Sequence, residues 1–356
     1  MVSTDLISRV EGTDAFIRLP LHMSALFLII LAGLMMGSFV VPMKVMPHWD
    51  FENTWLLFCF MALVILPTLV AVLTVPHLLQ VFLTSPPRSL VLTTVCGLGY
   101  GCGSVLFGLG VRELGMGLTY SIVAGLSSSL GSIIPWLGAH DQPMSYSLLL
   151  WLGVLVMLGG VAICSVAGRE RANRLENAPA EMRPQSRLYL GLAICVSSGI
   201  LCCFQNVGLA YGLGIIRQAE ALGASLRDAP NAAWFIIMNC GFVATVLYYG
   251  RLISRKQSWV KYRTKTFPYF CLALLMALMW EGVLVGYGAG ANKLGHLGPS
   301  VGWPILMSIS IVTSNTLGAA TGEWRGAGRK AAVIMILGIA VLLMAVVILG
   351  WASTKV

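Results

Sequence analysis

The sequence predicts an all-α integral membrane protein of ten transmembrane helices, arranged as two inverted five-helix repeats. Of 356 residues, 57% are hydrophobic and only 10% charged, with a mean hydropathy of +0.84. Such a chain has too little polar surface to be a soluble globule. Ten apolar stretches follow one another, each close to the roughly 20 residues that a helix needs to cross a bilayer. A polar connector, 168–187, divides them into five and five.

The chain is almost wholly occupied by these stretches. Residues 1–23 form an N-terminal tail, 24–167 the first half, 168–187 a cytoplasmic connector and 188–356 the second half. The first apolar run lacks a small-residue cleavage site, so we expect an uncleaved first helix. The predicted spans are 24–43, 53–75, 89–109, 116–138, 146–166, 188–213, 231–250, 268–290, 298–320 and 331–351.

Basic residues are divided unevenly between the two sides of the predicted membrane. The positive-inside rule places the richer side in the cytoplasm and both termini outside. The net charge of +9 therefore reports orientation and does not indicate a nucleic-acid partner. One side holds Lys44, Arg112, Arg169, Arg171, Arg174, Arg183, Arg187, Arg251, Arg255, Lys256, Lys261, Arg263, Lys265, Arg325, Arg329 and Lys330, against Arg9, Arg18, Arg88, Arg217, Arg227, Lys293 and Lys355 on the other.

The two halves resemble each other in corresponding spans. The run 108–115 has a counterpart in 286–295, and each precedes a hydroxyl-rich helix that includes Ser128 in one half and Ser310 in the other. Two five-span halves must also lie upside down relative to each other. Inverted repeats of this kind are typical of secondary transporters, whose substrate site lies near the midplane between the halves.

Glu281 is the only acidic residue inside any predicted span. A charged carboxylate at that depth costs about 2.5 to 3.5 kcal/mol by insertion scales, so such a group usually has a function. A secondary transporter driven by protons needs one group that takes up and releases a proton, and Glu281 is our candidate for that group if protons are the driving ion. The alternative is a permanently protonated Glu281 that only fixes helix packing.

Other polar and aromatic side chains lie at depth and are candidates for a substrate site. Amides and hydroxyls both donate and accept hydrogen bonds and can bind a polar solute, although they also link helices to one another. Tryptophan rings stack on the apolar faces of ligands but are common at membrane interfaces too. Lysine after a kinking proline (Pro42) either contacts substrate or snorkels to the interface. The candidates are Gln205, Asn206, Asn239, Asn315, Ser310, Trp280, Trp303 and Lys44.

No metal site, cofactor site or catalytic constellation is predicted. The cysteines all fall inside spans at no metal-ligand spacing, and the histidines lie near span ends. An enzyme or a polytopic sensor is therefore disfavoured. These residues are Cys59, Cys96, Cys102, Cys164, Cys195, Cys202, Cys203, Cys240 and Cys271, with His22, His48, His77, His140 and His296.

Several runs resemble the bacterial L-rhamnose/proton symporter family, a branch of the drug/metabolite transporter superfamily. They combine Trp, Pro and charged residues at fixed spacing over nearly the whole chain. Two features depart from the family pattern: the longer N-terminal tail and Glu281 after Trp280. The matching runs are 37–44, Trp49, 52–55, 66–67, 114–117, 199–201, Asn206, 302–304, 322–325 and 328–329.

The resemblance implies ten helices in the bacterial inner membrane and uptake of a sugar driven by protons. L-rhamnose or a related deoxyhexose, with one methyl group and several hydroxyls, suits a cavity of amides, hydroxyls and Trp. The partners expected are thus the sugar, protons and the lipid bilayer. The alternative is a drug/metabolite-type permease or exporter of another small solute, with Glu281 as counter-ion if that solute is a cation.

Overall fold

The computed structural model describes residues 23–114, 116–138, 144–175, 185–322, 324 and 326–353, and this part of the chain is helical and contains no strand. Residues 1–22 of the predicted tail, residues 176–184 of the connector, Glu323 and Arg325 lie outside it. The first span, Met23–Val45, ends in the 3₁₀ turn η1 (Val41–Val45), which begins beside Pro42 as the sequence predicts. After it come α2 (Phe51–Phe60), the π-helical η2 (Met61–Ile65), α3 (Leu66–Thr74), α4 (Leu78–Thr84), α5 (Pro87–Leu114), α6 (Met116–Leu137), α7 (Met144–Leu175), α8 (Gln185–Cys202), α9 (Phe204–Tyr211), α10 (Leu213–Ala221), α11 (Pro230–Lys256), η3 (Ser258–Arg263), α12 (Thr266–Lys293), η4 (Gly295–Leu297), α13 (Gly298–Ala320) and α14 (Gly328–Ser353).

The all-helical membrane fold is confirmed. Within the described residues, nine helices are long and apolar enough to cross a membrane, and each coincides with one of the ten predicted spans. The remaining one, 116–138, coincides with α6, whose apolar part, Ile122–Leu137, is shorter than the other nine. The count of ten and the inverted repeat therefore stay predictions.

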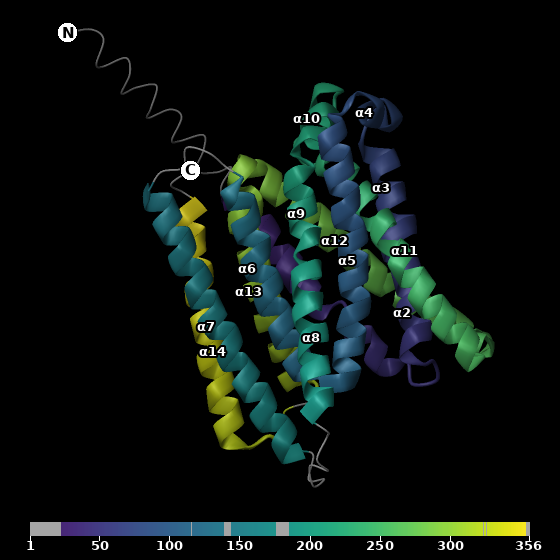
Figure 1. Ribbon diagram of the computed structural model, residues 1–356, viewed down its shortest axis with the longest axis vertical. Helices are drawn as coiled ribbons and strands as arrows, with labels where there is room; N and C mark the ends of the chain where they lie inside the picture. Colours follow the sequence, from purple (N-terminus) through teal and green to yellow (C-terminus); the bar gives the residue numbers. More distant parts are fainter. Residues whose placement is uncertain are drawn as a thin grey trace.

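The helices run between two ends of one bundle (Figure 1). We call lower end the side, at the bottom of Figure 1, where 46–50 joins the first span to α2 and 257–265 joins α11 to α12. The upper end carries α4, α10 and the connection 222–229. α7 and α14, the fifth and tenth predicted spans, pack along each other at the left edge of Figure 1.

Glycines let the central helices approach closely. Gly101 of α5 lies directly against the backbone of Gly241 on α11, where any side chain would collide with the Gly241 carbonyl. Gly290 of α12 lies against Ala25 and Ile29 of the first span. The first span is therefore in backbone-to-backbone contact with a helix of the second half.

Two spans depart from regular α-helix. In the second span the π turn η2 comes just before Pro67, whose ring would clash with the carbonyl four residues earlier in a regular helix. The sixth span is broken into α8, α9 and α10 around Cys203 and Gly212. Both interruptions lie where polar or aromatic side chains collect between helices, and that region is described next.

Candidate substrate and proton site

Asn206 of α9 links four helices in the upper half of the bundle. Its side chain is fully buried. Nδ2 donates to the carbonyl oxygen of Gly131 on α6 at 2.6 Å and to that of Pro299 on α13 at 2.9 Å. Oδ1 accepts a hydrogen bond from the Tyr287 hydroxyl on α12. In this conformation, therefore, the amide is occupied by helix-to-helix bonds.

Aromatic rings close the space around Asn206. The Trp303 ring lies 5.5 Å from that of Tyr287, and its Nε1 donates to the Ser127 carbonyl of α6 at 3.1 Å. Gly131 leaves room for that indole, because a Cβ there would lie 2.6 Å from Nε1 of Trp303. We call Asn206, Tyr287, Trp303, Gly131 and Pro299 the Asn206 cluster. It joins α6 of the first half to three helices of the second half and fills the space between them.

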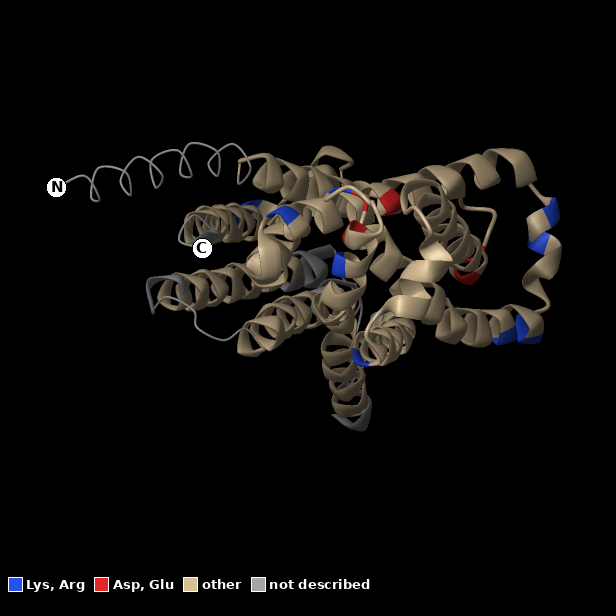
Figure 2. Cartoon of the chain, turned by 90° about the horizontal axis from the view of Figure 1, so that it is seen from above, with Lys and Arg blue, Asp and Glu red and all other residues tan. Residues whose placement is uncertain are grey.

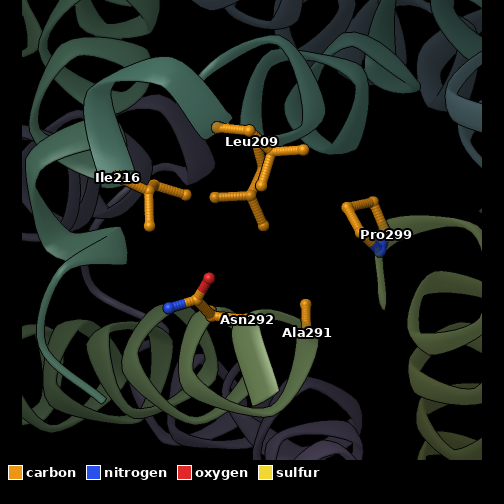
Figure 3. A pocket seen from close by; sticks show the side chains of 7 residues that line it. Leu209, Ile216, Ala291, Asn292 and Pro299 are labelled. Atoms are coloured by element: carbon orange, nitrogen blue, oxygen red, sulfur yellow. The ribbon is translucent and has the colours of Figure 1, made fainter. Parts of the chain in front are cut away.

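A small pocket adjoins the cluster towards the upper end (Figure 3). In Figure 3, Leu209 and Ile216 of the sixth span face Ala291 and Asn292 of α12. The lining is mostly apolar, and the gap is too small for a sugar ring. Nδ2 of Asn292 is already engaged with Oε1 of Glu220, at 2.7 Å. The pocket is therefore a small gap in the packing above the Asn206 cluster and is not itself a sugar site.

Glu281 lies near the middle of α12, fifteen residues after Thr266 and twelve before Lys293. It is 7% exposed, and its Oε2 atom makes no hydrogen bond within the described part of the chain. The neighbouring Trp280 is 6% exposed, and its Nε1 likewise has no partner there. An acceptor and a donor thus lie side by side in the sequence, both withdrawn from water and both unsatisfied.

The Trp280 ring belongs to an aromatic cluster drawn from both halves of the chain. Ring centroids of Trp280 and Phe39 are 5.1 Å apart, and those of Phe39 and Phe58 are 5.4 Å apart. Trp55 continues the series at 5.2 Å from Phe58, and its Nε1 is also buried without a partner. We call Phe39, Trp55, Phe58 and Trp280 the aromatic cluster. Ring faces beside free N–H donors are the chemistry that recognises sugars.

Unsatisfied buried groups are costly, so those beside the aromatic cluster are candidates for contacts with a ligand. A buried donor or acceptor without a partner costs about 1–3 kcal/mol, and native proteins keep few of them. Glu281, Trp280 and Trp55 supply three such groups on or beside the aromatic cluster. A proton on the carboxyl group and hydroxyl groups of a ligand would satisfy them.

The structure separates the other predicted residues. Gln205 is buried beside Asn206, and Trp303 belongs to the Asn206 cluster. The Ser310 hydroxyl is buried and donates to the Met307 carbonyl of its own helix at 2.8 Å. Asn315 likewise donates to Ile311 at 2.9 Å.

Two candidates lie away from both clusters. Nδ2 of Asn239 donates to the Phe235 carbonyl at 2.8 Å and to the Thr68 hydroxyl of α3 at 3.3 Å. Lys44 lies exposed at the lower end, where Nζ donates to the Thr321 hydroxyl at 2.9 Å. The substrate roles of all these residues stay predictions.

One expectation needs correction: Glu281 is not the only acid inside a span. The second span begins at Phe51 and not at residue 53, so it includes Glu52, and the sixth span continues through α10 to Ala221, so it includes Glu220. The Glu52 side chain is 7% exposed, and its Oε1 lies 2.6 Å from Nζ of Lys256. A carboxylate is stabilised in the first turn of a helix by the backbone N–H groups there, and an apolar-window reading of the sequence misses that turn.

Many membrane transporters are helical bundles in which several segments cross the membrane and polar groups are buried between them. The described part of this chain has that architecture. Within the described residues, no group of His, Cys, Asp or Glu could hold a metal ion.

The chain belongs to the L-rhamnose-proton symport protein family, whose model matches residues 20–354. The protein is thus a multi-pass membrane transporter and not an enzyme, as the sequence resemblance suggests. Similar curated proteins are the L-rhamnose-proton symporters of Escherichia coli O17:K52:H18, Klebsiella pneumoniae subsp. pneumoniae and Cronobacter sakazakii, each 24% identical over 88% of this chain and 93% of the relative.

The bonds of Asn206 predict a stability effect that its location alone does not. Asn206→Ala removes the partner of the Tyr287 hydroxyl, together with two helix-to-helix bonds to carbonyl oxygens, at about 1–3 kcal/mol for the buried hydroxyl left unpaired. We expect a lower thermal unfolding midpoint in detergent, and a smaller decrease for Tyr287→Phe, which removes one bond. Asn315→Ala is the matched control, because its amide bonds only its own helix. Equal midpoints for the Asn206 and Asn315 variants would contradict the assignment.

Proposed function

We propose that this protein is a proton-coupled secondary transporter that takes up a sugar, L-rhamnose or a related deoxyhexose, by alternating access. Family membership supports transport of this class, and an identity of 24% to the L-rhamnose-proton symporters leaves the sugar itself to experiment. The observation that carries the coupling is the buried Glu281 carboxyl group with an unpartnered Oε2.

Glu281 couples proton and sugar through its charge. Without a proton, the Glu281 side chain is a charge in a region that largely excludes water, and within the described residues no lysine or arginine pairs with it. With a proton, the carboxyl group is neutral and can donate a hydrogen bond. The protonated carboxyl group therefore suits sugar binding and movement of the halves. Release of the proton on the other side restores the charge and weakens the site.

The aromatic cluster supplies the surface for the sugar ring. Trp280 offers its face and Nε1, and Glu281 follows it on the same helix. Movement of the two halves apart would free hydrogen-bonding groups now used between helices, and on this basis Asn206 and Ser310 are the proposed hydroxyl contacts from the sixth and ninth spans. The apolar methyl group of a deoxyhexose fits against Phe39 and Phe58.

We place the protein in the bacterial inner membrane with its lower end in the cytoplasm and both termini outside. Basic side chains support this orientation, and Figure 2 shows blue segments gathered on the protruding loop between α11 and α12. A reporter that is active only in the periplasm, fused to Val356, should give signal. A cytoplasmic signal would contradict this orientation or the count of ten spans.

Substrate and coupling are tested together in membrane vesicles. Labelled L-rhamnose, other deoxyhexoses, ordinary hexoses and a small organic cation are offered with and without an imposed pH gradient. We expect gradient-driven accumulation of the deoxyhexose alone. Gradient-driven movement of the cation would favour the permease alternative, with Glu281 as counter-ion.

Glu281→Gln should separate accumulation from exchange. The amide keeps the shape of the side chain and cannot exchange a proton, so we expect loss of uphill accumulation with counterflow of unlabelled for labelled sugar retained. Glu220→Gln, at the upper end of the sixth span, is the control and should accumulate sugar normally. Normal accumulation by Glu281→Gln would remove this residue from the coupling mechanism.

Trp280 should be sensitive to the loss of its ring face. If it stacks on the sugar, Trp280→Phe keeps a face and Trp280→Ala does not, at a difference of about 0.5–1.5 kcal/mol, or up to about 10-fold in apparent affinity. Initial uptake rates over a range of sugar concentrations measure this. Equal apparent affinities in both variants at normal expression would mean that Trp280 serves helix packing and does not stack on the sugar.

A further inference from the structure

One short segment of the first half is in contact with the second half along its entire length. This segment, His48–Asn53, includes the end of the connection between the first span and α2 and the first turn of α2. It lies against the end of α11, η3 and the start of α12. Each of its six residues contacts residues 249–269. We call these two facing segments the lower-end clamp.

Two ion pairs bridge the clamp. Nζ of Lys261 lies 2.5 Å from Oδ1 of Asp50, and both side chains are more than a third exposed. Nζ of Lys256 lies 2.6 Å from Oε1 of Glu52, and here the carboxylate is 7% exposed while the lysine is 52% exposed. The Glu52 charge is therefore buried and is compensated from the other half of the chain.

Hydrogen bonds and rings complete the contact. Nε1 of Trp49 donates to the Thr264 carbonyl at 2.8 Å, and the Tyr262 hydroxyl donates to the Asn53 carbonyl at 2.8 Å. The fully buried Asn53 side chain donates to the Ser258 carbonyl at 3.1 Å. The Trp49 ring packs edge-on against Tyr262, with centroids 4.9 Å apart.

The loop that receives the segment has an unusual backbone. Gln257 and Lys265, on either side of η3, have φ values of 53°, in the left-handed region that residues with side chains seldom adopt. Strained positions of this kind persist where the surrounding contacts hold them, and they cluster at switch regions. The clamp contacts lie on the residues next to these positions, on Lys256 and Ser258 beside Gln257 and on Thr264 beside Lys265.

The corresponding place at the upper end is bonded differently. There 75–86 and 222–229 connect the spans that an inverted repeat would pair with those of the clamp. The bonds nearby run between uncharged groups: Asn231 donates to the Thr74 hydroxyl at 2.9 Å, and Gln218 donates to the Thr84 hydroxyl at 2.9 Å. Within the described residues, no ion pair joins these two connections. Among the described residues, the ion pairs that join the two halves therefore lie at the lower end, while the upper end has a lysine-to-hydroxyl bond from Lys293 to Ser24.

We propose that the lower-end clamp is the gate through which the substrate leaves, and that Glu52 is the positioning residue that holds it closed. This proposal rests on the proposed alternating access between the halves. A site between two halves opens to one side only if the contacts between the halves on that side separate. The clamp residues form such contacts, so they must part once in every transport cycle.

The Glu52–Lys256 pair suits a contact that opens and closes. While the gate is closed, the lysine and the first-turn amides of α2 compensate the buried carboxylate. When the halves part, water enters the lower end and hydrates both charges, so neither is left buried and unpaired. Removal of one partner alone destabilises the closed state and leaves the open state unchanged.

The test measures opening of the gate in the absence of sugar, through the rate at which a buried cysteine is modified. Cys59 is 2% exposed on α2, two turns above Glu52, and is shielded while the lower end is closed. The full-length protein, in inside-out vesicles, is treated with a membrane-impermeant maleimide, and modification of Cys59 is followed by mass spectrometry. Glu52→Gln should raise the rate about 10-fold or more, because the open state is otherwise a minor population of about 0.1–10%.

Charge exchange and a local ion pair provide the controls. The double variant Glu52→Lys with Lys256→Glu restores the pair in reverse and should return the Cys59 rate towards that of the unaltered chain. Asp228→Asn breaks the Arg227–Asp228 pair, which lies within one upper connection and joins no halves, and should change nothing. Concentrative uptake should fall with Glu52→Gln and recover in the exchange variant.

Each outcome decides the proposal. An unchanged Cys59 rate in Glu52→Gln would overturn it, and so would loss of the protein from the membrane that the exchange variant does not reverse. A raised rate that the exchange variant corrects supports the gate even if L-rhamnose is not transported. In that case the substrate assignment fails and the gate stands.

Discussion

The absence of water from the bilayer interior is the constraint on which the rest of this structure depends. Within it, every polar group must find its partner inside the protein, so the described chain is helical and its buried amides are bonded from helix to helix. Asn206 shows the rule in its full form, with three bonds to three other helices. Glu281 and Trp280 are among the exceptions, because each is buried with an atom that has no hydrogen-bond partner within the described residues.

The same constraint separates the molecule into three levels with different chemistry. The upper half is closed by an amide and aromatic rings, the middle contains the acid and the aromatic cluster, and the lower end is closed by ion pairs at the edge of water. Charged pairs suit the level at which water returns whenever the contact opens, since hydration offsets the loss of the pair. Uncharged contacts suit the level that stays drier. This order along the bundle follows the path that a solute would take.

Much of the fold could be predicted from composition and spacing, because length and hydropathy fix where a helix crosses a membrane. The two neighbouring candidates Trp280 and Glu281 could be selected in the same way, because a carboxyl group inside an apolar span is rare and Trp280 is next to it. Tyr287, Phe39 and Phe58 could not, because aromatic residues are ordinary in such helices and only the packing of distant spans brings these rings together. Glu52 was missed since hydropathy does not locate the first turn of a helix. Asn206 could be selected as important, but its residue type does not say whether an amide bonds helices or a ligand.

The π turn Met61–Ile65 gives the second span a built-in unit of rotation. A π turn contains one residue more than the α-helical turn it replaces, and it lies between Pro67 above and the rings of Trp55 and Phe58 below. One residue of an α-helix corresponds to about 100° about its axis. The extra residue therefore turns α3 by about this angle relative to an uninterrupted helix, and Pro67 fixes its position. As a result, α3 presents to its neighbours side chains that a regular helix would place on other faces.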